Sequence, residues 1–434
     1  MGAEINRTID ALWRIESPRV IAGLVRLVCD VGIAEDLAHD ALVTALEQWP
    51  RAGIPDNPGA WLMTTARNRA IDRLRRDRML ARHHEALGHE LEMDELHDTD
   101  RLPASVEDEI GDDLLRLIFI ACHPLLSTEA RAALTLKLLG GLTTAEIARA
   151  FLQPEATIAQ RIVRAKRTLS DAHVPFEIPR GAELAARLSS VLEVIYLVFN
   201  EGYSATAGAD WMRPALCEEA LRIGRILAEL APEEPDVHGL VALMEIQASR
   251  TAARTGAGGE PVLLMDQNRA LWDRLLIRRG LASLARGEAL AQSRGPYLLQ
   301  AAIAACHARA VSVAETDWLK ITALYAELAQ VSPSPVIELN RAVAIAMAHG
   351  PAAGLALADQ LAAAGALKSY HLLPSVRGDL LSRLGRHREA RAEFERAAAL
   401  TQNERERRLL LDRASACEIA ISNGVLHVVH AADR

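Results

Sequence analysis

The residues of this chain best suited to chemistry are cations spaced along one short segment. From Pro154 to Ala172, apolar side chains recur at helical spacing at Ile158, Ile162 and Ala165, which predicts a helix with one packed face. The basic residues of the segment fall between them, at Arg161, Arg164, Lys166 and Arg167. Guanidinium and ammonium groups on the open face of such a helix can contact the phosphates and base edges of nucleic acid.

A second set of cations lies nearer the N-terminus. Between Trp61 and Arg82 the basic residues face only two acids, Asp72 and Asp77. They are Arg67, Arg69, Arg73, Arg75, Arg76, Arg78 and Arg82. The charge then changes from positive to negative, because residues 83–113 are rich in acids and contain a single arginine. The net charge of −8 is therefore unevenly spread. A basic, an acidic and a second basic segment suggest two DNA-contacting modules joined by a polyanionic linker.

The sequence predicts no catalytic group, metal site or cofactor. The cysteines stand singly along the chain, which favours reduced thiols over a disulfide framework or a thiolate zinc site. His84 and His89 flank Glu85, but their spacing of five does not place them on one helix face as a zinc-protease motif requires. Because no nucleophile, base or metal ligands converge, an enzyme is the least favoured class.

These groups must be positioned by helices, because the composition favours an all-α protein. Of the 434 residues, 50% are hydrophobic but only 4% are aromatic, and alternating β-branched runs are almost absent. No apolar run reaches membrane-spanning length, and the N-terminus lacks the apolar core of a signal peptide. We expect a soluble cytoplasmic protein with no membrane partner.

Residues 125–172 predict a helix, a Gly-Gly break, a short helix, a turn and a longer helix that starts at Pro154. This is the pattern of a helix-turn-helix. Thr143 or Thr144 would cap the short helix, with Glu146 in its first turn. An ordinary surface helical hairpin is the alternative.

Breaks in the pattern divide the chain. A helix before Val28, one over residues 34–49 that ends at Pro50, and one from Ala60 through the arginines form a first module. We expect this module over residues 1–82, an acidic flexible linker over 83–112, the helix-turn-helix module over 113–174 and a helical domain over 175–434.

The C-terminal domain is predicted to contain helix pairs of the tetratricopeptide type. Small and aromatic residues stand where paired helices approach one another. They are Gly378, Gly385, Ala390, Phe394 and Ala397. Weaker copies of the pattern occur near residues 336–361 and 217–244. An irregular helical domain is the alternative.

Two of these segments resemble the extracytoplasmic-function (ECF) sigma factors of bacterial RNA polymerase. Residues 34–49, AEDLAHDALVTALEQW, with 58–78, PGAWLMTTARNRAIDRLRRDR, look like region two of that family, and the helix-turn-helix looks like region four. The long extension resembles the subgroup with a C-terminal tetratricopeptide-like domain. Its phrases NEGYSATAGADWMRPALCEEALRIGRILAELAP and ELNRAVAIAMAHGPAAGLAL are of that kind. The resemblance implies a protein that binds core polymerase, directs it to a two-part promoter, helps melt the proximal element and leaves during elongation.

The resemblance also implies roles for particular residues. Glu35, Asp36, His39 and Asp40 would contact the β′ clamp helices of polymerase, with the β flap as a second contact. His39 stands where the family usually has Gln. Without the resemblance, an ordinary solvated acidic face is the simpler interpretation.

The proximal promoter element would be contacted from the loop before the arginine helix. Asn57 is a candidate reader of an extruded base through its amide. The full set is Asn57, Trp61, Arg67, Asn68, Arg69, Arg73, Arg75 and Arg76. Trp61 has the spacing of a core residue. Arg67 and Arg73 could equally be partners of Asp72.

The upstream element would be contacted from the helix-turn-helix. The set is Thr144, Pro154, Glu155, Thr157, Gln160, Arg161, Arg164, Lys166 and Arg167. Lys166 and Arg167 are best placed for phosphates, whereas the others lie in the early turns that reach base edges. Glu155 could instead serve the helix dipole.

The acidic linker and the C-terminal domain are the two remaining parts of the chain. The acidic linker could mimic nucleic acid inside polymerase channels or act as a solubilising hinge. The C-terminal domain would be regulatory, and family members are often encoded beside small YCII-like (DGPF) proteins, which implies such a partner. The main alternative is a free-standing transcription regulator that binds an operator as a dimer and senses a ligand or protein through its repeat domain.

Overall fold

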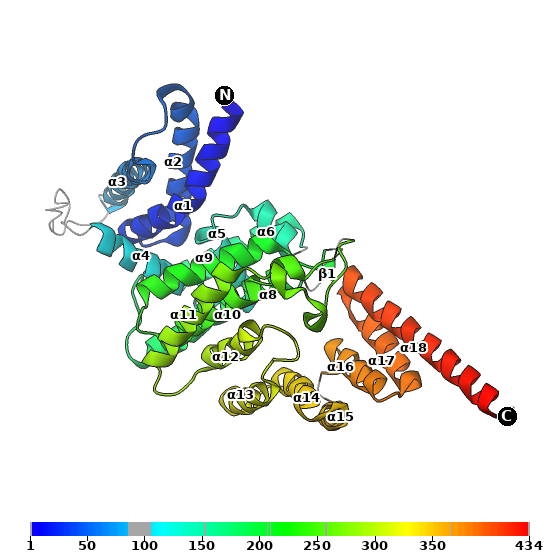
Figure 1. Cartoon of the computed structure of the whole chain (residues 1–434). Coiled ribbons are helices and arrows are strands. Elements are labelled where there is room, and N and C mark those ends of the chain that lie inside the picture. The colour runs from blue at the N-terminus through cyan, green and yellow to red at the C-terminus, as the bar shows by residue number, and fades with distance from the viewer. Residues whose placement is uncertain are drawn as a thin grey trace. The chain divides into compact units, whose positions relative to one another are not determined.

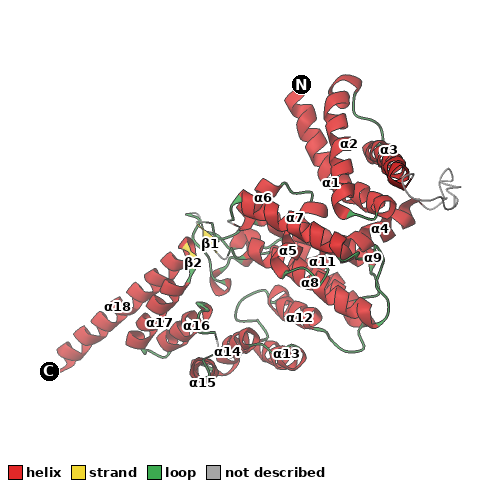
Figure 2. Ribbon diagram, turned by 180° about the vertical axis from the view of Figure 1, so that it is seen from behind, coloured by secondary structure: helices red, strands yellow, loops and turns green. Residues whose placement is uncertain are grey.

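The computed structural model describes residues 2–85, 106–151, 153–205, 207–208, 210–256, 258–365 and 367–432. Most of these residues are helical and very few are in strands, as Figures 1 and 2 show, so the all-α prediction is confirmed. The two short strands β1 (Ala207–Gly208) and β2 (Gln402–Asn403) pair in parallel. No helix among the described residues is long and apolar enough to cross a membrane. The chain divides into two compact units, Met1–Leu197 and Val198–Arg434.

The first unit starts with α1 (Gly2–Val28), α2 (Val31–Ala52) and α3 (Pro58–Glu85), which pack on one another. Asp30 caps α2, since its carboxylate accepts a hydrogen bond of 2.8 Å from the Ile33 amide. The helix continues two residues beyond Pro50, where the sequence predicted its end. It stops at Gly53, whose φ of 90° is a conformation that favours glycine.

The rest of the first unit contains α4 (Val106–Ala121), α5 (Thr128–Leu138), α6 (Thr144–Phe151), α7 (Glu155–Asp171) and the first part of α8 (Ala182–Tyr203). Helices α6 and α7 form the predicted helix-turn-helix, with Ile147 of α6 and Ile158 of α7 in its core. Pro154 is the residue before α7 rather than its first residue. Of the predicted acidic linker, residues 86–105 lie outside the described residues, and 106–112 belong to α4.

The second unit contains the rest of α8 and a succession of helices, most of them joined by short connections. They are α9 (Pro214–Leu230), α10 (Pro235–Ala248), α11 (Arg274–Leu290), α12 (Pro296–Arg309), α13 (Trp318–Val331), α14 (Pro335–His349), α15 (Pro351–Ala363), α16 (Leu372–Arg383), α17 (His387–Leu400) and α18 (Glu404–Ala432). Many begin with proline, whose fixed φ suits the first helical position and whose missing N–H would have no partner there. Three short 3₁₀ turns, at 251–253, 264–266 and 269–271, lie between α10 and α11.

Consecutive helices of the second unit pack as pairs (Figure 1). Between α16 and α17 the contact is close, because a Cβ on Gly378 would lie 2.8 Å from the Phe394 ring. Ala390 and Ala397 of α17 are fully buried, and Gly385 makes the intervening turn at φ 75°. The residues that the sequence singled out for helix pairing therefore lie at a helix-pair contact.

Candidate nucleic-acid interface

Helix α7 presents a polar face opposite its packed one. Ile158, Ile162 and Ala165 are buried. The predicted promoter-contacting residues of this segment that are exposed are Pro154, Glu155, Thr157, Gln160, Arg164 and Arg167. Arg161 is half-buried, as are Lys166 and, at the start of α6, Thr144. The structure thus places the predicted residues on α7 and its approach, except Thr144, which lies at the start of α6.

The start of α6 is held by a reciprocal pair of hydrogen bonds. The Thr143 hydroxyl accepts from the Glu146 amide at 3.2 Å, and the Glu146 carboxylate accepts from the Thr143 amide at 2.8 Å. Arg14 of α1 forms an ion pair with the same carboxylate. Burial opposes ionisation of Glu146, yet the Thr143 hydrogen bonds and the Arg14 charge together lower its pKa. Of the two candidate caps, Thr143 is the one used.

The loop before α3 places Asn57 at the surface. Its side-chain oxygen accepts a hydrogen bond of 3.0 Å from the Ala60 amide, which caps the start of α3. Asn57 is exposed, and because only its side-chain oxygen is used in the cap, its NH₂ group can still donate to a base. Trp61 is half-buried, with its ring edge-on to Trp49 at 5.3 Å between centroids. This packing fits the core role that its spacing favoured.

The arginines of α3 differ in their surroundings. Arg69 donates to the Thr44 hydroxyl at 2.7 Å and lies 3.2 Å from the Asp40 carboxylate, so it ties α3 to α2. Asn68, Arg75 and Arg76 are exposed. Arg67 and Arg73 are half-buried. The exposed members can reach a nucleic-acid backbone, whereas Arg69 already supports the fold.

The predicted acidic stripe on α2 is not uniform. Asp36 and Asp40 are exposed, but Glu35 is buried, with 3% of its surface accessible. Glu35 pairs with Lys137 of α5 and Lys166 of α7. His39 is half-buried, and its imidazole Nδ1 lies 2.9 Å from the Glu35 carbonyl oxygen. The interpretation of this stripe as an ordinary solvated acidic face is therefore wrong at Glu35.

Sequence reasoning missed Lys137 altogether. The signal was present, because this lysine is the single charge in the apolar run LTLKLLG at the end of α5. A cation in such a run must reach water or an acid, since burying it unpaired is costly. Nothing in the sequence says which acid it reaches.

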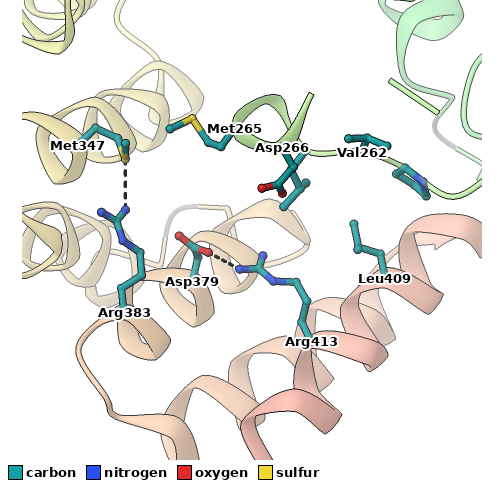
Figure 3. A pocket seen from close by; sticks show the side chains of 10 residues that line it. Val262, Met265, Asp266, Met347, Asp379, Arg383, Leu409 and Arg413 are labelled. Carbon is teal, nitrogen blue, oxygen red and sulfur yellow. Dashed lines mark hydrogen bonds and ion pairs between the residues drawn. The ribbon is translucent and has the colours of Figure 1, made fainter. Parts of the chain in front are cut away.

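The second unit contains an open pocket of about 640 Å³ between α14, α16, α18 and the segment 261–266 (Figure 3). Met265, Met347 and Leu409 supply apolar surface. Arg413 pairs with Asp379. The Arg383 guanidinium instead donates to the Met347 sulfur at 3.3 Å, and no carboxylate among the described residues is within ion-pair distance of it. The charged lining of the pocket is balanced, because Asp266 and Asp379 accompany Arg383 and Arg413. The described residues include no cluster of His, Cys, Asp or Glu that could hold a metal ion.

Comparison with known families agrees with the two modules. The Sigma-70 region 2 family matches residues 12–79, and the Sigma-70, region 4 family matches residues 116–169. The chain has a basic α3 that follows a capped loop, and then a helix-turn-helix with an exposed polar face. This order of modules defines a sigma factor, the class of protein that directs RNA polymerase to promoters.

The C-terminal extension shows which group of sigma factors this chain resembles. A family of unknown function (DUF6596) matches residues 187–288. The chain is 43% identical over 404 residues to an uncharacterized protein of Rhizobium meliloti (strain 1021), and the alignment covers 92% of this chain and 94% of that protein. The chain belongs to the ECF-type sigma factors that carry a C-terminal helical extension. No solved structure matches it.

Proposed function

We propose that the protein binds core RNA polymerase, directs it to a two-part promoter and helps to melt the proximal element, without catalysing a reaction itself. Helix α7 reads the upstream element through the early-turn side chains Gln160, Arg161 and Arg164. The observation that supports this proposal best is the exposure of Gln160 and Arg164 on a helix whose opposite face is buried.

The proximal element is opened at the start of α3. Extruding a base costs a few kcal/mol of stacking, which contacts to the base and its phosphates must offset. Asn57 offers an exposed amide at that point, and Arg75 and Arg76 offer exposed cations further along the same helix. Asp36 and Asp40 of α2 supply the exposed acids for the basic clamp helices of polymerase.

The first experiment is to mix the purified protein with bacterial core RNA polymerase and isolate any complex. Transcription is then run from the promoter of the protein's own gene and from a randomised promoter library. A stable complex with discrete transcripts supports the proposal and gives the promoter sequence. No complex, together with tight binding of the protein alone to a palindromic site, would make it a dimeric operator-binding regulator instead.

The second unit is proposed to regulate the first. Removing it after Pro179 would also remove the start of α8, which packs on the first unit. There Ser190 donates to the Cys122 carbonyl at 2.7 Å, and Arg187 donates to the Phe119 carbonyl at 2.9 Å. A truncation after Leu197 keeps these contacts and tests regulation more cleanly.

Transcription by the chain ending at Leu197 should differ from that of the full chain, either upward or downward. Equal transcription by the two proteins would rule out the regulatory role. A truncation after Pro179 serves as the comparison that reports lost folding. A small YCII-like protein, implied by the family resemblance, is the partner to test against the second unit.

A further inference from the structure

Three arginines of the second unit lie together without an acidic partner. Arg250, Arg254 and Arg269 all belong to the segment of short 3₁₀ turns between α10 and α11. No aspartate or glutamate of the described chain is within ion-pair distance of any of them. Glu315 is the acid that acts on Arg269, but it is exposed and forms no ion pair with it. The unit therefore contains three like charges that its described residues do not neutralise.

Two aromatic rings connect the three guanidinium groups. The centroid of the Tyr203 ring lies 3.5 Å from the guanidinium carbon of Arg254 and 5.7 Å from that of Arg250. The centroid of the Trp272 ring lies 5.9 Å from Arg250 and 4.9 Å from Arg269. Arg250 is thus the middle member, with a second cation at each ring that it contacts. The rings attract the arginines but carry no net charge, so the cations still repel one another.

Arg254 and Arg269 make structural hydrogen bonds, whereas Arg250 makes none. Arg269 donates to two backbone carbonyls at the end of α12, at 2.8 and 2.6 Å. Arg254, with 8% of its surface accessible, donates to the Tyr203 carbonyl at 2.7 Å. The Arg250 guanidinium has no acceptor among the described residues, and its buried Nε is unpaired. Because Arg250 is only half-buried, its terminal nitrogens stay accessible to a ligand.

Other unpaired groups at these rings are also donors. The indole N–H groups of Trp211 and Trp272 are buried without an acceptor, and so is the Nε of Arg269. The Trp211 ring centroid lies 5.5 Å from the guanidinium carbon of Arg254. Burying cations and donors without acceptors is costly, and native proteins seldom leave them so. The cluster lacks both negative charge and acceptor atoms, and an oxyanion supplies both.

We propose that Arg250, Arg254 and Arg269 form a binding site for the phosphate group of a small molecule, with Arg250 as the residue that contacts it. A phosphate group carries up to two negative charges and several acceptor oxygens, so it offsets more of this charge than one carboxylate does. The planar guanidinium fork also matches two phosphate oxygens at once. The site contains no residue assigned to polymerase or promoter DNA, so this inference does not depend on the proposed function.

Phosphate binding is measured by isothermal titration calorimetry on the full chain. The probes are inorganic phosphate and glycerol 3-phosphate, titrated at constant ionic strength so that screening does not change. Arg250→Met removes the guanidinium and keeps an unbranched side chain against both rings. It should weaken binding at least about tenfold, as expected for loss of a charge-assisted hydrogen bond. Arg388→Met, which removes an exposed cation from α17, is the matched control and should bind as the parent does.

The two probes distinguish the sources of the phosphate group. Tighter binding of inorganic phosphate supports a site for the free ion, and tighter binding of glycerol 3-phosphate supports a site for a phosphate ester. The inference is overturned if the parent binds neither probe or if Arg250→Met binds as well as the parent. Tighter binding of succinate than of either phosphate would also overturn it, because the site would then select carboxylates.

Thermal unfolding gives a second readout of the same site. A ligand that binds only the folded chain raises its Tm. Saturating phosphate should therefore raise the Tm of the parent and of Arg388→Met, and should leave that of Arg250→Met almost unchanged. An equal rise in all three proteins would show that phosphate acts elsewhere on the chain and would contradict the assignment to Arg250.

Discussion

At the scale of single residues, α7 should divide its work between base edges and phosphates. Arg161→Ala should weaken binding to the cognate upstream element by about 1–3 kcal/mol and barely change binding to random DNA. Arg167→Ala, at a highly exposed position near the end of α7, should weaken both equally and reduce the salt dependence by about one counterion. Holoenzyme binding to both DNAs over a range of salt checks this. If each variant lost the same affinity for both DNAs, the proposed division between base-reading and phosphate-binding residues would be wrong.

Arg69 should contribute to the stability of the fold rather than to DNA binding. Its hydrogen bond to Thr44 and its ion pair with Asp40 join α3 to α2 at a partly exposed position, so Arg69→Ala should lower the free energy of unfolding by about 1 kcal/mol. Arg76→Ala, which removes an exposed side chain bonded to the Asp72 carbonyl, is the control and should change it by less than about 0.5 kcal/mol. Urea denaturation of the two proteins distinguishes the roles.

The sequence located the exposed residues of α7 because helical periodicity fixes which side chains share a face. It could not assign Glu35, because periodicity places this residue at the edge of the apolar face and its partners, Lys137 and Lys166, come from distant helices. Arg69 was grouped with the DNA-contacting arginines for the same reason, since charge alone does not show a partner across two helices.

At the scale of elements, the cap of α6 should matter for the whole helix-turn-helix. Thr143→Ala removes the hydroxyl that accepts from the Glu146 amide, which should cost about 1 kcal/mol of stability. Thr144→Ala is the matched control at the next residue, whose hydroxyl takes no part in the reciprocal pair of bonds, and should cost less. Chemical denaturation compares the two. Equal losses would mean that the cap assignment is wrong.

The helices and their contacts were predictable where a residue type suits only one structural role. Small residues opposite Phe394 predicted the α16–α17 pair, because only a small side chain permits so close an approach. The end of α2 was placed too early, at Pro50, because proline removes one hydrogen bond but does not by itself stop a helix near its end. Gly53, three residues after that proline, ends the helix, because its φ of 90° turns the chain out of the helical path after its N–H has made the last bond, to the Trp49 carbonyl at 3.0 Å.

At the scale of the whole molecule, acid should weaken the second unit through a buried histidine. His307 packs edge-on against Trp318 at 5.1 Å. Burial, together with the charges of Arg250 and Arg269, lowers the pKa of His307 from 6.5 to about 4. The unfolded chain therefore takes up a proton below pH 6.5, whereas the folded chain does so only near pH 4. Stability from this group is fully present above pH 6.5 and is lost as the pH falls towards 4, by up to about 3 kcal/mol.

His307→Phe keeps a ring against Trp318 and removes the titration. Thermal unfolding measured from pH 7 to pH 4 should show a shallower loss of Tm for this variant than for the parent. His349→Phe, at the exposed end of α14, is the control and should follow the parent. If the His307→Phe curve also follows the parent, the acid sensitivity of the unit arises elsewhere, and burial of His307 near two arginines is compensated within the fold.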